Sequence, residues 1–357
     1  MFAYWGLFFC SFLFALQEHP RDYQVGERLS KIPVTWLVMF IFLTLLIGFR
    51  HVVGGDWPSY LRHLEVARSV SFLGLFTLKD PGYQILNYIS IHLGGGIYTV
   101  NLISGSIFSL GLVLFCRTLP RPMLGVLTAI PYMTIVIAMG YTRQSIALGL
   151  VMIALTSLIH KSIFRFILWV ILAALFHKSA MLFIPLAALL SSKNRLLNVF
   201  WVGIAAAISY KVLLADDVEV LYSNYIESQY HSEGALIRVI MCVFPALLFF
   251  YFQSLFNMSS KEKKLWSWLS ILSIFSFTLL FLTAASTAVD RVALYLLPLQ
   301  LVVFSYMPEI LGNRGKSNIH WVLLICIYYA SVQFVWLFFA HHAHAWLPYQ
   351  FYPFTFL

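Results

Sequence analysis

Residues 36–48 read WLVMFIFLTLLIG and carry no charge, whereas residues 49–65 read FRHVVGGDWPSYLRHLE and carry several charged side chains around Gly54 and Gly55. An uncharged run of this kind suits the hydrocarbon core of a bilayer, which a helix of about 20 apolar residues can cross. The two stretches together predict a membrane helix that ends at a polar surface.

The rest of the chain has the same apolar composition. Of its 357 residues, 61% are hydrophobic and 10% are charged, and the mean hydropathy is +0.84. A soluble domain of this length could not bury so much apolar surface, so lipid must surround much of the chain. Because no linker or change in composition divides the sequence, we expect a single all-α polytopic membrane domain over residues 1–357.

About twelve transmembrane helices are expected. The first sixteen residues lack a basic start and a small-residue cleavage site, which favours a retained first span over a signal peptide. The segment near 72–95 is short and contains Asn87 and His92, which predicts an interfacial or re-entrant helix. The expected spans lie near residues 1–16, 32–49, 97–116, 123–139, 145–159, 163–176, 179–190, 197–214, 235–254, 265–283, 288–306 and 319–340.

The distribution of Lys and Arg predicts the orientation of the chain in the membrane. Fourteen of the 23 basic residues fall in short loops that would share one side. We expect that side to face the cytoplasm, with both termini outside. The loops are residues 17–31, 117–122, 160–165, 191–196, 257–264 and 312–318.

The other nine basic residues lie on the opposite side or within apolar runs, where charges usually face a cavity or a partner. Two of them are Lys178 and Arg238. For four of them we favour a structural explanation, in which the side chain reaches the lipid headgroups or pairs with a carboxylate such as Asp290. These four are Arg62, Arg68, Lys79 and Lys211. A functional role is favoured for Arg50, Arg143 and Arg291, because guanidinium groups from separate helices can hold paired phosphate oxygens.

A carboxylate and an imidazole on the same face could supply acid-base chemistry. Asp56 follows two glycines that allow a sharp turn near a ligand, but it is nearly as well explained as the N-cap of a helix over WPSYLRHLE. His177 titrates near neutrality in its ordinary state, so it could accept a proton or donate a hydrogen bond. A single interfacial histidine is as often only a satisfied polar residue.

Other motifs exclude several kinds of site. His341, His342 and His344 lack carboxylate partners and metal-site spacing, so we expect a solvated tail and no metal there. The four cysteines lie in apolar runs and are expected to be small core residues. The absence of a P-loop and of a dinucleotide fingerprint disfavours nucleotide-sugar enzymes and ATP-driven pumps, and no face suits nucleic acid.

Four motifs in this order resemble the EpsG family of polysaccharide polymerases, which belong with the Wzy-type polymerases of bacterial surface glycans. The resemblance extends from about the second expected span to the eleventh. The motifs are FR…GGD…Y with Arg50, Gly55, Asp56 and Tyr60, YTRQSIA with Arg143 and Gln144, FHKSA with His177, and DRVALY with Arg291 and Tyr295.

The resemblance implies a GT-C-like glycosyltransferase of the bacterial inner membrane. It implies an enzyme that joins oligosaccharide repeat units carried on undecaprenyl diphosphate at the periplasmic face, for O-antigen, capsule or exopolysaccharide. No metal or other cofactor is implied. The implied partners are the lipid-linked donor and acceptor, membrane lipids, and flippase and chain-length regulator proteins.

On this interpretation the site residues take distinct roles. Asp56 or His177 is the catalytic base, and Arg50, Arg143 and Arg291 bind the diphosphate. Residues expected to position the substrate or the arginines are Tyr60, Gln144, Lys178 and Tyr295.

Two other functions remain open from the sequence. A ligase that moves finished glycan onto another acceptor is barely distinguishable from a polymerase. A flippase for the same lipid-linked glycans should show charges near the bilayer midplane and repeat symmetry between its halves. The charges here gather at one mouth and no internal repeat is visible, which favours the polymerase.

Overall fold

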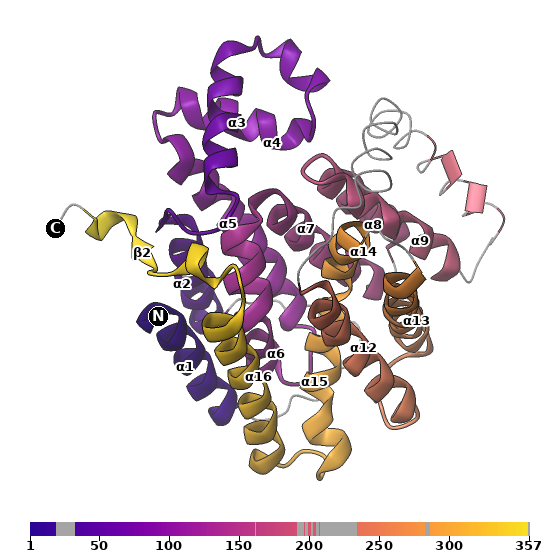
Figure 1. Ribbon diagram of the computed structural model, residues 1–357. Helices are drawn as coiled ribbons and strands as arrows, with labels where there is room; N and C mark the ends of the chain where they lie inside the picture. Colours follow the sequence, from indigo (N-terminus) through magenta and orange to yellow (C-terminus); the bar gives the residue numbers. More distant parts are fainter. Residues whose placement is uncertain are drawn as a thin grey trace.

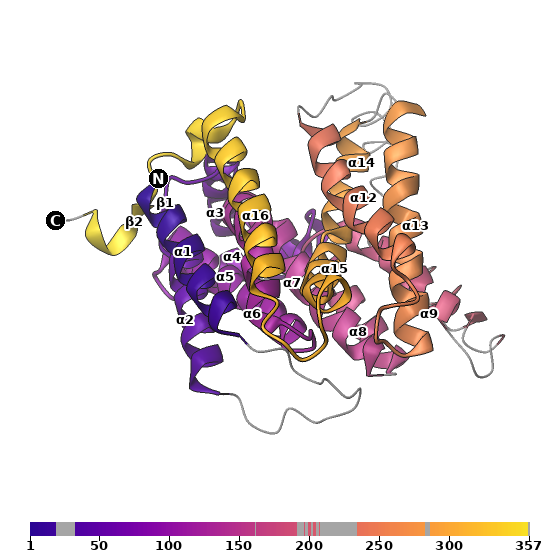
Figure 2. The same cartoon turned by 90° about the horizontal axis from the view of Figure 1, so that it is seen from below.

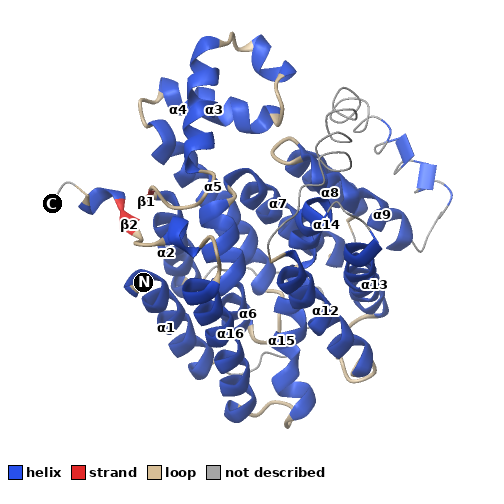
Figure 3. Cartoon of the chain, viewed as in Figure 1, coloured by secondary structure: helices blue, strands red, loops and turns tan. Residues whose placement is uncertain are grey.

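The computed structural model describes residues 1–18, 33–160, 162–190, 234–282 and 286–355, and a few isolated positions between 196 and 207. Helices dominate this part of the chain, and one pair of two-residue strands accompanies them (Figure 3). In the antiparallel pair, β1 (Arg50–His51) lies beside β2 (Gln350–Phe351), with Arg50 opposite Phe351. The expected all-α membrane architecture is therefore confirmed at the level of its helices.

Most predicted spans coincide with helices to within a few residues. The span near 197–214 lies mostly outside the described residues, as does Lys211. The helices that match predicted spans are α1 (Phe2–Gln17), α2 (Val34–Gly48), α5 (Gly96–Cys116), α6 (Pro122–Ala129) with the π-helix η2 (Ile130–Ala138), α7 (Thr142–Ile159), α8 (Ile163–Ala174), η3 (Lys178–Phe183) with α9 (Ile184–Leu190), α12 (Ala235–Tyr251), α13 (Ser260–Leu282), α14 (Ser286–Ala293) with η6 (Leu294–Leu296) and α15 (Pro298–Leu311), and α16 (Ile319–Phe339).

Four of these helices, α5, α7, α13 and α16, are long and apolar enough to cross a membrane. A fifth span results if α14 to η6 and α15, which meet at a bend of 44°, are taken together. Six shorter apolar helices or helix pairs occupy other predicted spans. The described residues thus form a multi-pass membrane protein with four to five spans of full length.

The helices are arranged around a central group. In two views at right angles, α1 and α2 lie on one side, α12 and α13 lie on the other, and α5 to α7 lie between them (Figures 1 and 2). The segment near 72–95 forms η1 (Leu73–Thr77) and α4 (Pro81–His92), which packs with α3 (Trp57–Ser69) outside the bundle (Figure 1). At twelve residues, α4 is too short to cross a bilayer, in agreement with the expected interfacial or re-entrant helix.

Small residues allow α5 and α7 to approach closely at the centre of the bundle. A Cβ atom at Gly111 would lie 2.1 Å from the carbonyl oxygen of Gly149, and one at Gly149 would lie 2.7 Å from Cα of Phe108. Glycines let helix backbones pack closely in membranes, where the hydrophobic effect does not drive helices together because lipid tails are as apolar as the side chains. This crossing holds the middle of α7 against α5.

We expect the Gly149→Ala substitution to lower the thermal unfolding temperature of the purified protein. The added methyl group meets backbone atoms of α5 that cannot rotate away, and overpacking of this kind costs about 1–3 kcal/mol. Gly6→Ala in α1 is the control, because a Cβ at Gly6 meets nothing within 4 Å. Equal unfolding temperatures for the two variants would contradict the close approach.

The turn that joins α2 to α3 is built on the C-terminal segment. Gly54 has φ of +100° and its N–H donates to the carbonyl oxygen of Ala345 at 2.8 Å. A Cβ at Gly54 would lie 2.8 Å from Cα of Gly140, so only glycine fits. Trp346 lies against Gly140 on its other side and donates from Nε1 to the carbonyl oxygen of Ile135 at 2.8 Å.

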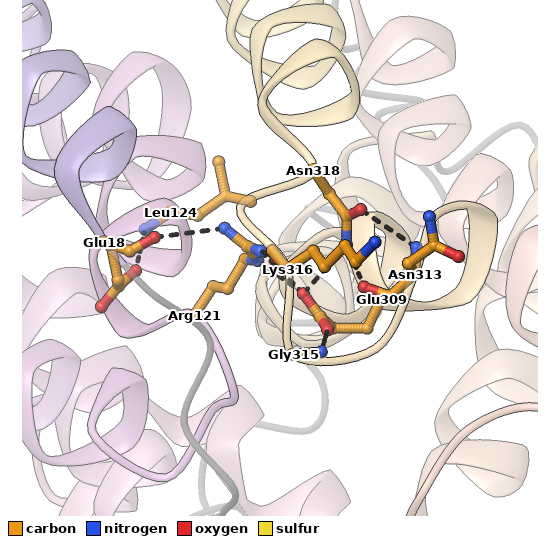
Figure 4. A network of polar contacts seen from close by, with 8 residues as sticks. All are labelled: Glu18, Arg121, Leu124, Glu309, Asn313, Gly315, Lys316 and Asn318. Atoms are coloured by element: carbon orange, nitrogen blue, oxygen red, sulfur yellow. Dashed lines mark hydrogen bonds and ion pairs between the residues drawn. The ribbon is translucent and has the colours of Figure 1, made fainter.

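At the opposite end of the bundle, a network of polar contacts joins three of the loops expected to face the cytoplasm (Figure 4). Arg121 is 1% exposed and donates from Nη2 to Oε1 of Glu309 at 2.7 Å and to the carbonyl oxygen of Lys316 at 2.8 Å. Its Nη1 donates to the carbonyl oxygen of Glu18 at 3.3 Å. The contacts place the loops that follow α1, α5 and α15 at one end, as the charge distribution predicted.

Candidate functional site

A cavity of about 140 Å³ lies at the end of the bundle that carries α3 and α4. Its walls come from the start of α3, the start of α7, the turn between α8 and η3, and from α12, α14 and η6. The lining residues are Asp56, Tyr60, Tyr141, Arg143, Gln144, His177, Arg238, Thr287, Asp290, Arg291 and Leu294. Charged groups from segments far apart in the sequence therefore share one small space.

Six of the nine site residues predicted from the sequence line this cavity. The structure brings together side chains that are up to 235 positions apart, from Asp56 to Arg291. The six are Asp56, Tyr60, Arg143, Gln144, His177 and Arg291. Arg50, Lys178 and Tyr295 do not belong to the lining.

Two of the lining residues are fixed by hydrogen bonds to neighbouring elements. Arg143, in the first turn of α7, donates from Nη1 to Oδ2 of Asp80 at 2.6 Å. Gln144 donates from Nε2 to the carbonyl oxygen of Arg291 at 2.8 Å, which ties α7 to α14. The side chain of Arg143 is still 29% exposed, so part of its guanidinium group remains open to the cavity.

Asp56 is the residue before α3, but its side chain makes no capping hydrogen bond. Asp56 therefore occupies the N-cap position of α3, but its carboxylate does not cap the helix. Burial raises the pKa of Asp56 above the ordinary value, and the positive charges of Arg143 and Arg291 act in the opposite direction. A carboxyl group with a raised pKa holds a proton more readily than an ordinary aspartate does.

His177 is half-buried in the turn before η3, and its Nδ1 lies 2.6 Å from Oγ of Ser179. Burial, together with the charges of Arg291 and Arg143, lowers the pKa of His177 to about 3. The imidazole is therefore neutral at physiological pH. Because a hydroxyl group can donate or accept, either neutral tautomer of the imidazole satisfies the hydrogen bond with Ser179.

Arg50 lies behind the cavity wall. It is 1% exposed, and its guanidinium group donates to the carbonyl oxygen of Ile47 at 2.6 Å, to Oδ1 of Asn101 at 2.9 Å and to Oγ1 of Thr142 at 2.7 Å. Burial lowers the pKa of Arg50 to about 10, which still leaves it charged at neutral pH. Arg50 thus joins α2, α5 and the residue next to Arg143.

The other two predicted residues outside the lining lie close to His177. Tyr295 is buried, and its ring centroid lies 6.3 Å from that of His177. Lys178 is the first residue of η3 and follows His177 directly. Neither side chain lines the cavity, and the positioning roles of Tyr295 and Lys178 remain predictions.

Sequence reasoning missed an ion pair in the cavity wall. Arg238 in α12 pairs with Asp290 in α14, and both line the cavity. The sequence suggests Asp290 as a partner for basic residues outside the cytoplasmic loops, but it assigns neither Arg238 nor Asp290 to the site. Two opposite charges in otherwise apolar segments were the available signal, because each needs a partner at that depth.

The expected solvated tail is only partly correct. His341, His342 and His344 are exposed, whereas Trp346 is 1% exposed and its carbonyl oxygen accepts a hydrogen bond from Oη of Tyr4 at 2.7 Å. No group of three or more His, Cys, Asp or Glu side chains with metal-site geometry occurs among the described residues. Three of the four cysteines, Cys116, Cys242 and Cys326, are buried thiols, and Cys10 is exposed.

The model of the EpsG family matches residues 34–351, which include every residue of the cavity lining. No curated protein and no solved structure matches the chain.

Proposed function

The chain belongs to the EpsG family of Wzy-type polysaccharide polymerases, and from this we propose that it joins oligosaccharide repeat units carried on undecaprenyl diphosphate. The observation that carries the proposal is the cavity in which Arg143, Arg238 and Arg291 face Asp56 and Asp290. A reaction that releases a diphosphate needs fixed positive charge beside a group that can take up a proton.

In the proposed reaction, a hydroxyl group at the non-reducing end of the acceptor unit attacks the anomeric carbon of the donor chain. The bond between that carbon and the diphosphate oxygen breaks, and a glycosidic bond forms. The hydroxyl proton passes to the catalytic base, and undecaprenyl diphosphate leaves with the bonding electrons. The growing chain is now attached to the lipid of the acceptor.

We assign the diphosphate to Arg143 and Arg291. Both line the cavity, and guanidinium groups stay charged and present paired donors to phosphate oxygens. In this proposal these groups, rather than a metal ion, balance the charge that develops on the leaving diphosphate. Arg50 is assigned a different role from the one that the sequence suggested, because its two Nη atoms already donate to Ile47, Asn101 and Thr142. We propose that it holds Arg143 in place through Thr142.

The assignment of the base favours Asp56 over His177. A general base works best when its pKa approaches the working pH, and burial moves the pKa of Asp56 upward while it moves that of His177 down to about 3. A neutral His177 can instead hydrogen bond to the substrate. Tyr60, Gln144, Lys178 and Tyr295 would position the sugar or the arginines.

The proposal includes a location and an architecture. We place the enzyme in the bacterial inner membrane with the cavity open to the periplasm, in a GT-C-like arrangement of about twelve spans. The products would be O-antigen, capsule or exopolysaccharide, and the partners would be the flippase and chain-length regulator that handle the same lipid-linked units. The basic loops at the Arg121 end support this orientation.

Reconstitution tests the reaction. Purified protein in liposomes that contain a lipid-linked repeat unit should produce a ladder of glycans that differ by one unit. Movement of the unit across the bilayer without a ladder would instead identify a flippase, and transfer only to a different acceptor would identify a ligase.

The orientation has its own test. In a Cys10→Ser background, which removes the exposed native thiol, cysteines placed at Asp56 and Ser179 should react with a membrane-impermeant thiol reagent added from outside. A cysteine at Lys263, at the start of α13, should stay unlabelled until the membrane is opened. Labelling of the Lys263 position in intact cells would reverse the proposed orientation and the face of the site.

A further inference from the structure

Asp80 holds a backbone conformation that its sequence context opposes. Its φ of 54° and ψ of 62° lie in the left-handed region, which few residues other than glycine adopt. The next residue is Pro81, and a residue before proline prefers extended backbone. Strain of this kind persists where surrounding structure enforces it, often at functional sites.

The usual reason for an aspartate at this position does not apply. Asp80 precedes α4, where aspartate commonly caps a helix through its side chain, yet its side chain makes no capping hydrogen bond. The carboxylate instead accepts the hydrogen bond from Nη1 of Arg143 at 2.6 Å and is 9% exposed. The strained backbone therefore serves to point the carboxylate at an arginine of the cavity.

The turn that carries Asp80 is fixed to the element that carries His177. The N–H of Gly82 donates to the carbonyl oxygen of Leu175 at 2.9 Å. A Cβ at Gly82 would lie 3.0 Å from Cβ of Leu175 and 3.1 Å from its carbonyl oxygen, so the two backbones are in close contact. The start of α4, the end of α8 and the first turn of α7 thus meet around Asp80.

Arg143 has a second carboxylate within electrostatic reach. The charge of Arg143 acts on Asp56, which lines the same cavity, whereas Asp80 is not among the lining residues. An arginine released from Asp80 would turn toward Asp56, because the other carboxylate of the cavity, Asp290, is paired with Arg238. It would then neutralise the proposed base instead of binding diphosphate.

We propose that Asp80 is a positioning residue that holds Arg143 toward the diphosphate and away from Asp56. The inference rests on the proposed function, because it assigns Arg143 to diphosphate and Asp56 to proton transfer. Asp80 itself touches neither substrate nor the reacting atoms. Its effect on the reaction passes through Arg143.

Two substitutions separate the charge from the backbone strain. Asp80→Asn keeps the side-chain shape and the tolerance for the left-handed region but removes the charge. Asp80→Gly relieves the strain and removes the carboxylate. Val52→Gly is the matched control, because Val52 also has positive φ, at 50°, and is 57% exposed with no ion pair.

We expect Asp80→Asn and Asp80→Gly to lower kcat for chain extension roughly 10- to 100-fold, since a small displacement of a positioning group has effects of this size. Val52→Gly should match the wild type. In an Arg143→Ala background, Asp80→Asn should cause no further loss, because the two residues act as one unit. Independent losses that multiply, or full activity in Asp80→Gly, would overturn the proposal.

The pH dependence of the chain-extension rate gives a second readout, which a purely structural role of Asp80 would not change. The titratable and charged groups that share the cavity with Asp56 are Tyr60 from α3, Tyr141 and Arg143 at the start of α7, His177 before η3, Arg238 from α12, and Asp290 and Arg291 from α14. With Arg143 turned toward Asp56, its positive charge favours the ionised carboxylate. The acidic limb of the rate profile should therefore move to lower pH in Asp80→Asn, and an unchanged limb would count against the proposal.

A binding measurement distinguishes failure of this inference from failure of the proposed function. The probe is farnesyl diphosphate, a short polyprenyl diphosphate, bound to the purified full-length protein. If the wild type makes no glycan ladder but binds the probe, and Asp80→Gly weakens binding only while Arg143 is present, the polymerase assignment fails and the role of Asp80 stands. If Asp80→Gly leaves binding unchanged, or the wild type does not bind, Asp80 does not position Arg143 for a diphosphate.

Discussion

Chain extension should stop when Asp56 is replaced by Asn. The amide keeps the size of the side chain but cannot accept the hydroxyl proton, and loss of a general base typically lowers a rate roughly 100- to 10,000-fold. The measurement is the initial rate of ladder formation in liposomes, normalised to folded protein. His177→Ala should also impair extension, but less, because the neutral imidazole is assigned to orient substrate.

The same substitution has an expected effect on stability. The folded-state pKa of Asp56 is raised, so folding favours its protonated form, and the ionised carboxylate reduces stability at pH values above that pKa. Asp56→Asn removes this penalty and should unfold at the same or a higher temperature near neutral pH. A stable protein without activity would separate a catalytic role from a structural one.

The wild-type rate should rise with pH through the acidic range as Asp56 loses its proton. Because burial raises the pKa of Asp56, the midpoint should lie above that of an ordinary aspartate. Normal extension by Asp56→Asn would transfer the role of base to His177. Normal extension by both Asp56→Asn and His177→Ala would show that the cavity is not the catalytic site.

The second large effect is expected for Arg143→Lys. Lysine keeps the charge but loses the planar pair of donors, so it cannot both hold Asp80 and grip two phosphate oxygens. A contact that strengthens in the transition state is worth about 3 kcal/mol, which is on the order of a hundredfold in rate. Ladder formation by the reconstituted variant gives this ratio directly.

Two further variants control for the arginine substitution. Arg68→Lys should have no effect, because Arg68 is exposed on α3 and both side chains reach headgroups. Arg50→Lys should lower the polymer yield and also the unfolding temperature, because lysine cannot serve Ile47, Asn101 and Thr142 together. Wild-type rates in Arg143→Lys and Arg50→Lys would show that neither arginine takes part in the reaction.

Much of the fold followed from the sequence because bilayer hydrophobicity acts locally. The apolar runs predicted α2, α5 and α16 to within a few residues, and the polarity of residues 79–96 distinguished α4 from a span. The bend between η6 and α15 and the π-helix η2 begin beside Pro298 and Pro131, which lie inside predicted spans and permit kinks. The bend angle of 44° and the π-helical turn were not predicted, because they depend on how neighbouring helices pack.

The site was predicted where a charge stood out against an apolar background. Arg143, His177 and Arg291 stood out in this way, and the structure places all three in one cavity. Asp80 was missed because it lies in a polar segment, where a carboxylate does not differ from its surroundings. Arg50 stood out equally well but lies behind the cavity, because hydropathy reports the depth of a side chain and not the direction in which it points.

The strand pair β1–β2 has a consequence for biosynthesis. The N–H of Gly54, in the turn that carries Asp56, donates to the carbonyl oxygen of Ala345, and the N–H of Tyr352 donates to the carbonyl oxygen of Phe49. These partners lie about 300 residues later in the chain, so Phe49 and Gly54 lack them through nearly all of translation. Contacts between segments so distant in sequence form late in folding. A nascent chain therefore lacks these supports for the turn that carries Asp56 until Ala345 and Tyr352 have been made, and we expect chains truncated before Ala345 to be inactive.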